Sequence, residues 1–149
     1  MSWHRLAIAD PELAAFGKER LHDRGAYLAT IRKDGSPRLH PVRPIVSDKH
    51  LFVFMGSTSP KQHDMVRDGR YVLHGTITNP DGGPWEFYEF YVEGRGILVN
   101  DPAMYQIANA ATAYPRNETF ILFELHVEGA FSTVYGIDGQ PIRRRWRTP

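Results

Sequence analysis

A short polar segment between two apolar runs contains the residues best suited to bind an anion. In the sequence STSPKQHDMVRDGR (residues 57–70), Ser59 is a candidate N-cap, Pro60 suits the first turn of a helix, and Gln62 stands three residues after the serine, as in a capping box. A helix N-terminus presents unpaired N–H groups and a partial positive charge, and Lys61 adds a full charge there, so the segment is a candidate phosphate site. The alternative is that the serine and glutamine only cap a structural helix and that the lysine is solvated.

A second candidate segment is PRLHPVRP, residues 37–44. Pro41 and Pro44 cannot donate a hydrogen bond to a neighbouring strand, so the segment is predicted to be a strand at a sheet edge or at a bulge. Such a strand leaves backbone groups free to contact a planar ligand. His40, in this segment, is the best candidate for a general acid or base, because histidine titrates near neutral pH.

Other chemistries find little support in the sequence. The chain has no cysteine, which excludes a thiolate metal site, a cysteine nucleophile and disulfide bonds. Its seven histidines form no H-x-H, H-x-x-x-H or H-E-x-x-H pair, so no metal site is predicted, although His40, His63 or His74 could each be a single axial haem ligand. No G-x-S-x-G motif is present, which argues against a serine hydrolase.

Composition indicates a small globular protein. The 149 residues, 42% hydrophobic and 12% aromatic, suffice for one domain with its own core, spanning residues 1–149. Eighteen basic and seventeen acidic residues give a net charge of +1, which argues against a nucleic-acid partner or a polybasic membrane contact. No apolar run approaches the ~20 residues of a membrane span, and the first residues do not resemble a signal peptide. We therefore expect a soluble, cytoplasmic protein with no membrane or nucleic-acid partner.

The first half of the chain contains signals for the elements that position these segments. Asp10 and Pro11 start a helix that runs to about Leu21. A KDGSP turn at residues 33–37 joins two strands in a hairpin, and an aromatic strand follows at residues 50–55. The simplest arrangement of these three strands is an antiparallel meander.

The second half of the chain continues in the same way. A fourth strand leads to a loop at residues 79–84, and residues 85–100 alternate with a period of two around a bend near Gly94. A helix begins at Asp101, and a last long strand bends near Gly129. Six or seven strands with short helices and frequent turns indicate a mainly β protein, a small closed or partly closed antiparallel β-barrel.

The order of the segments between Gly25 and Gly75 is also informative. A strand ending in LATIRKDGSP is followed by a strand with RLHPV, a third strand of aromatic residues, a helix that opens with Ser and Lys, the segment MVRDGR and another strand. This order resembles that of the pyridoxamine 5′-phosphate oxidase-like, FMN-binding split-barrel family. The resemblance implies a split β-barrel fold.

The resemblance also implies a set of cofactor contacts. In that family the helix after the third strand approaches the flavin phosphate, and the second and third strands line the isoalloxazine ring. The corresponding residues here are Ser59, Lys61 and Arg38 for the phosphate, and His40, Pro41, Val42, Met55 and Gly56 for the ring. The family is typically a homodimer with two cofactors at the subunit interface, so the closing RRRWRTP segment implies that Trp146 approaches the flavin of the partner subunit.

The function implied by the resemblance is that of an enzyme, a flavin-binding oxidoreductase that uses FMN to transfer hydride to a small-molecule acceptor. The chain is shorter than the oxidase, and that enzyme's pyridoxal-binding basic residues cannot be placed on it. A generic flavin or deazaflavin reductase therefore fits better than a vitamin B6 oxidase. The alternatives are an F420-dependent reductase of the same fold and a non-catalytic module that binds a flavin or haem.

Overall fold

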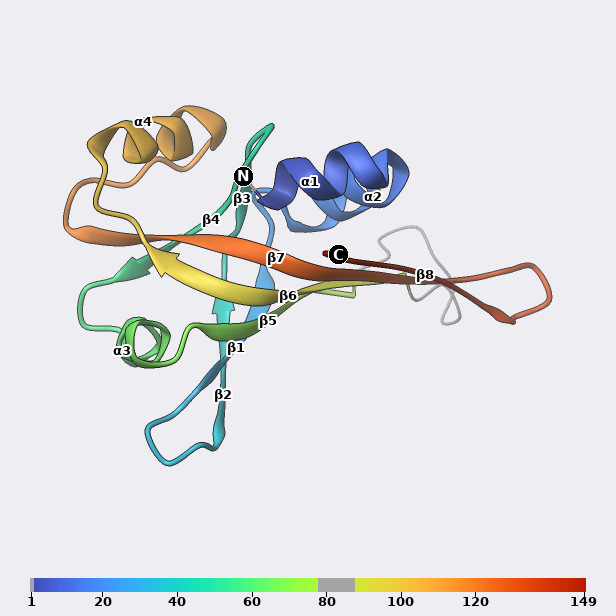
Figure 1. Ribbon diagram of the computed structural model, residues 1–149, viewed down its shortest axis with the longest axis horizontal. Coiled ribbons are helices and arrows are strands. Elements are labelled where there is room, and N and C mark those ends of the chain that lie inside the picture. Colours follow the sequence, from blue (N-terminus) through green and yellow to red (C-terminus); the bar gives the residue numbers. More distant parts are fainter. Residues whose placement is uncertain (1, 78–87) are drawn as a thin grey trace.

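The computed structural model of the chain describes residues 2–77 and 88–149 (Figure 1). The loop predicted at residues 79–84 and the beginning of the strand predicted from Trp85 lie outside these residues. Within the described part, no helix is both long enough and apolar enough to cross a membrane.

The described residues form four short helices. They are α1 (Ser2–Ala9), α2 (Pro11–Leu21), α3 (Pro60–Arg67) and α4 (Pro102–Ala111). The side chains of Asp10 and Asp101 accept hydrogen bonds of 3.0 and 2.9 Å from backbone N–H groups in the first turns of α2 and α4, as the Asp-Pro pattern predicts. The sequence gives no capping signal for α1, which is held instead by burial of Trp3 and Leu6.

The described residues also form eight antiparallel strands, which curl into a half-barrel. The strands are β1 (Ala26–Ile31), β2 (Pro37–Val42), β3 (Ile45–Val46), β4 (Leu51–Gly56), β5 (Arg70–Gly75), β6 (Glu89–Leu98), β7 (Phe120–Tyr135) and β8 (Pro141–Arg147). Their order is β2-β1-β5-β6-β7-β4-β3, and β8 also pairs with β7. This arrangement confirms the mainly β, split-barrel prediction. The expected six or seven strands fall short of eight because two-residue β3 is too short to produce a pattern.

Strand β7 divides the sheet. It pairs with β6 along one edge, while β4 and β8 pair with residues 120–124 and 129–135 of its other edge. The register between β6 and β7 shifts after Glu93, where Glu128 has no opposite partner, which is a β-bulge. The bulge confirms the bend predicted near Gly94. In Figure 1 the hairpin of β7 and β8 projects from one end of the molecule, and α3 and α4 lie at the other end.

The predicted meander of the first three long strands is wrong. Strands β1 and β2 form the expected hairpin, but β4 pairs with β7 and with β3, not with β2. Proximity in the sequence favours local pairing, whereas the true partner of β4 begins at Phe120 and no local pattern identifies it. Strand β2 therefore lies at one end of the sheet, in agreement with its proline at position 41.

The apolar core lies in two parts. The larger cluster fills the half-barrel beneath α1 and α2 and includes Leu6, Leu28, Phe90 and Phe123. The smaller cluster packs α4 against β3 and β4 through Ile45, Phe52, Val99, Ala108 and Leu122. This second cluster fixes the chain that follows α4 close to the ends of the strands predicted to bind the cofactor.

Candidate functional site

A cleft of ≈ 410 Å³ lies where β2, β4, the start of α3 and the chain after α4 meet. Its volume falls within the range of ~300–1,000 Å³ that is usual for sites that bind small molecules. It is lined by Gly25, by Pro41, Val42 and Arg43, by Ile45, Phe54 and Gly56, by Lys61, and by Thr112, Tyr114, Arg116 and Phe120.

Lys61 lies in the first turn of α3 and faces this cleft. Its ammonium group donates a 2.9 Å hydrogen bond to the hydroxyl oxygen of Ser59. Burial lowers the pKa of Lys61, because a partly desolvated ammonium group loses hydration that favours its charged form. No carboxylate in the described residues pairs with it. An anion bound in the cleft would supply the missing counter-charge.

The predicted capping box at the start of α3 is wrong. Ser59 is the N-cap residue, but its side chain accepts no hydrogen bond from the helix backbone. Gln62 is buried, and its side-chain amide donates to the carbonyl oxygen of Ser57 at 3.0 Å, away from Ser59. The first turn of α3 therefore has no side-chain cap, but Pro60 has no N–H and the backbone N–H of Gln62 donates to the carbonyl oxygen of Ser59 at 3.2 Å. This leaves the backbone N–H of Lys61 for an anion.

Strand β2 contributes one face to the inside of the half-barrel. Arg38, His40 and Val42 are partly buried, and the residues between them are exposed. The pKa of His40 is lowered, first by burial and then by the positive charges of Lys61 and Arg38. A lowered pKa favours the neutral imidazole. Val42 lines the cleft, whereas His40 does not.

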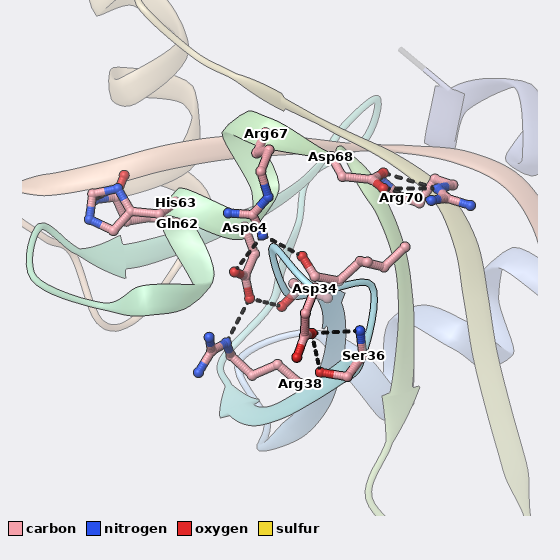
Figure 2. A network of polar contacts seen from close by, with 11 residues as sticks. Asp34, Ser36, Arg38, Gln62, His63, Asp64, Arg67, Asp68 and Arg70 are labelled. Atoms are coloured by element: carbon pink, nitrogen blue, oxygen red, sulfur yellow. Dashed lines mark hydrogen bonds and ion pairs between the residues drawn. The ribbon is translucent and has the colours of Figure 1, made fainter.

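A polar network that no sequence pattern indicates holds α3 against the β1–β2 hairpin (Figure 2). Asp64 is buried, and its Oδ2 atom accepts hydrogen bonds from Arg38 at 2.6 Å and from Thr30 at 2.9 Å. Arg67 donates to Asp64 Oδ1 at 2.9 Å and to the carbonyl oxygen of Ile31 at 2.7 Å. Burial acts to raise the pKa of Asp64, but the hydrogen bonds from the two arginines and the threonine outweigh it, so this pKa lies below its usual value.

The remaining predicted contacts are spread over the fold. Gly56 lines the cleft, and a Cβ atom there would meet no neighbour within 4 Å. The side chain of Met55 is buried in the core, so a cofactor could reach this residue only through its backbone. Arg38 is ion-paired with Asp64 and does not line the cleft, and Trp146 of β8 packs against the core. Cofactor contacts by these residues stay predictions.

The chain after α4 supplies a side of the cleft that the sequence does not predict. The carboxylate of Asp23 accepts a hydrogen bond from the hydroxyl of Thr112 and another, of 2.8 Å, from the backbone N–H of Ala113. Asp23 has a φ of 54°, in the left-handed region that aspartate adopts more readily than most residues. The sequence Asp23-Arg24-Gly25 does indicate a turn, but nothing local shows that this turn binds residues far along the chain.

Two further histidines were candidates for haem ligation. His63 is exposed on α3. His74 Nδ1 lies 2.6 Å from the carbonyl oxygen of Gly75, and its ring stacks on Tyr91 with centroids 5.9 Å apart. Neither histidine lines the cleft. Among the residues described, no three His, Asp or Glu side chains are arranged to hold a metal ion.

Known proteins resemble this chain in structure and not in sequence. No protein-family profile matches the sequence, and no curated protein matches it. A heme-binding protein from Mycobacterium smegmatis superposes with a TM-score of 0.65 at 14% identity. That similarity covers 96% of this chain and 56% of the mycobacterial protein, so the chain spans little more than half of that protein's length.

Two other solved structures match over most of both chains. PhzG from Burkholderia lata 383, in complex with tetrahydrophenazine-1-carboxylic acid, has a TM-score of 0.66 at 14% identity over 97% of this chain and 87% of PhzG. HutZ, the heme storage protein of Vibrio cholerae, has a TM-score of 0.59 at 14% identity over 93% of each chain. Identities this low establish a common fold and no more. The chain therefore has the split β-barrel fold that these proteins share.

Proposed function

We propose that the cleft binds the phosphorylated planar cofactor FMN and that the protein is a flavin-dependent oxidoreductase. The observation that carries the proposal is the position of Lys61, a partly desolvated cation at the uncapped start of a helix, in a cleft of ≈ 410 Å³. A charged ammonium group and a backbone N–H of the same residue are donors that a phosphate readily accepts.

The rest of the cleft suits a planar ring. Val42, Ile45 and Phe54 present apolar surface, and the space above Gly56 is open. Pro41, in an edge strand, leaves backbone groups unpaired with a further strand. The same surfaces would accept the ring of F420, which also carries a phosphate.

The chemistry divides between the cofactor and the chain. When bound, FMN supplies hydride transfer, while the protein supplies binding, orientation and exclusion of water. Lys61 holds the phosphate end, and the apolar residues keep water from the ring. The neutral imidazole of His40 offers one nitrogen that accepts a proton and one that donates, so it is our candidate acid–base group for a small acceptor bound beside the ring.

Haem binding without catalysis is the second candidate function. Two proteins with this fold are named for heme binding and heme storage. In this chain α3 carries the exposed His63, which lies two residues after Lys61. A haem propionate at Lys61 would use the same charge as a flavin phosphate.

We further propose a homodimer in which Trp146 approaches the partner's cofactor. Strand β8 pairs only with β7 among the described strands, and its side chains are exposed apart from the half-buried Trp146. A free strand edge with one partly buried tryptophan is suited to contact a second subunit. Light scattering coupled to size-exclusion chromatography should give twice the 17.0 kDa mass of the chain, and a mass of one chain would contradict the dimer.

The first test of function is the visible absorption spectrum of freshly purified protein, with mass spectrometry of whatever is released on denaturation. A flavin spectrum with the mass of FMN is expected, and steady-state NADPH oxidation above that of free flavin would establish turnover. A deazaflavin or haem spectrum would identify the corresponding alternative. A colourless protein that fails to bind added FMN, F420 and haem would refute the proposal.

A further inference from the structure

The cleft carries charge of one sign. Lys61, Arg43 and Arg116 line it, and no acidic residue among those described does so. The whole chain has nearly equal numbers of basic and acidic residues, so an ordinary patch of its surface would mix the two. Basic groups gathered around a concave site attract anions and raise their local concentration.

The two arginines of the cleft are also unpaired, unlike many arginines elsewhere. Ion pairs with Asp or Glu at 2.6–2.9 Å are formed by Arg38, Arg67, Arg70, Arg144 and Arg147. Neither Arg43 nor Arg116 has such a partner within the described ranges 2–77 and 88–149. Their charges are therefore available to a ligand.

Aromatic rings orient both guanidinium groups. The Arg43 guanidinium lies 4.0 Å from the ring centroid of Tyr114, and the Arg116 guanidinium lies 5.3 Å from that of Phe120. Two hydrogen bonds of 2.8 and 2.9 Å between the side chain of Asn109 and the backbone of Arg116 hold the second arginine's segment on α4. Stacking occupies the face of a guanidinium and leaves its N–H groups free to donate to an anion.

Arg43 and Arg116 belong to a different part of the cleft from Lys61. Their guanidinium groups contact Tyr114 and Phe120, which follow α4 in the chain. Lys61 comes from the first turn of α3. A phosphate assigned to the start of α3 therefore leaves the two arginines for a second anion.

We propose that Arg43 and Arg116 form a second anion site, and that the molecule bound beside the cofactor is a planar aromatic carboxylate. This inference rests on the proposed function, because it assigns the Lys61 end of the cleft to the cofactor phosphate. A carboxylate matches the planar donor fork of arginine, and its ring can contact the aromatic side chains beside the two arginines. The substrate class is thus set by Arg43 and by the chain after α4.

Titration calorimetry with naphthalene-2-carboxylate and its uncharged carboxamide tests the site. The wild-type protein should bind the carboxylate about tenfold more tightly than the amide, and Arg43→Gln or Arg116→Gln should abolish that preference. Arg5→Gln is the control, because Arg5 is an exposed arginine of α1 outside the cleft. Equal binding of the two compounds, binding of neither, or a preference that survives Arg43→Gln would overturn the proposal.

Two further titrations separate this inference from the proposed function. Lys61→Ala should weaken FMN binding and leave the carboxylate preference intact, and a protein that prefers the carboxylate but binds no FMN would refute only the proposed function. The protein loaded with FMN should still bind naphthalene-2-carboxylate. Competition between the carboxylate and FMN would instead assign the second anion site to the cofactor and overturn the substrate class.

Discussion

Basic side chains on two sides of α3 differ in what balances their charge. Arg38 and Arg67 share the buried carboxylate of Asp64, which Thr30 also contacts. Lys61, one turn before Asp64 in the same helix, has a serine hydroxyl as its hydrogen-bond partner and faces a cleft. The first group joins α3 to the sheet, whereas the second presents an uncompensated charge to whatever enters the cleft.

The contrast gives a criterion for reading basic residues in this fold. A guanidinium whose counter-charge is internal and buried contributes to stability, because removing either partner leaves a costly unpaired group. A cation beside a cavity without an internal counter-charge contributes little to folding and is suited to bind an anion. Substitutions in the two groups should therefore affect different measurements.

The largest effect is expected from Asp64→Asn. It removes the charge that balances Arg38 and Arg67, and it should lower the free energy of unfolding by about 1.5–3 kcal/mol, measured by denaturant titration. Asp68→Asn is the matched control, because Asp68 pairs with Arg70 at 2.6 Å on the surface and such pairs contribute little. Equal stability of the two variants would contradict the structural role of Asp64.

Lys61→Ala should change binding and leave the fold intact. Loss of one charge-assisted contact to phosphate should weaken FMN binding about tenfold or more, while riboflavin, which lacks the phosphate, should bind the variant and the wild type equally. Fluorescence titration with both flavins measures this difference. Unchanged affinity for FMN would rule out the phosphate site at α3.

His40 and Asp64 should lose their contributions to stability in different pH windows. His40 has a lowered pKa in the folded state, so stability should fall as pH drops below its ordinary value of 6.5 toward the folded pKa, because the unfolded chain gains the proton first. Asp64 has a lowered pKa as well, so its contribution is complete above 3.8 and is lost as pH falls through its folded value. Thermal melts across this range should show that His40→Gln removes the first decline and Asp64→Asn the second. A first decline that His40→Gln leaves unchanged would assign it to another group.

The smallest effect on stability is expected from Ser59→Ala. The hydroxyl caps no backbone group, so its loss should cost less than ~0.5 kcal/mol. Asp101→Ala provides the comparison, because that carboxylate does cap α4 and its loss should cost ~1 kcal/mol. Similar losses in the two variants, compared by chemical denaturation, would show that Ser59 acts as a cap after all.

Short sequence patterns predicted the local structure well. The Asp-Pro pairs located the starts of α2 and α4, the KDGSP turn located the β1–β2 hairpin, and the alternation of the long strands indicated a β-barrel. These features succeed because caps, turns and strand alternation depend on residues a few positions apart. The order of segments between Gly25 and Gly75 was enough to identify the fold.

The candidate site was predicted only in part, because some of its residues meet through contacts between distant parts of the chain. Pro41, Val42, Gly56 and Lys61 lie in the segments that the sequence singled out, and all four line the cleft. Tyr114 and Arg116 reach it only through the packing of α4 and the pairing of β4 with β7, which no local pattern encodes. The prediction of a capping box was wrong because the side chain of Gln62 donates to the carbonyl oxygen of Ser57 and not to the N-cap residue.

The sequence by itself therefore determined most of the elements, the fold class and one side of the cleft, because each depends on short-range chemistry. The tertiary structure decided which charges are balanced, since Asp64 meets Arg38 only when α3 folds against the β1–β2 hairpin. It also decided the second side of the cleft, where the chain after α4 closes on Arg43. Burial and counter-charge are properties of the folded chain, and they separate basic residues that hold this protein together from those that can bind a ligand.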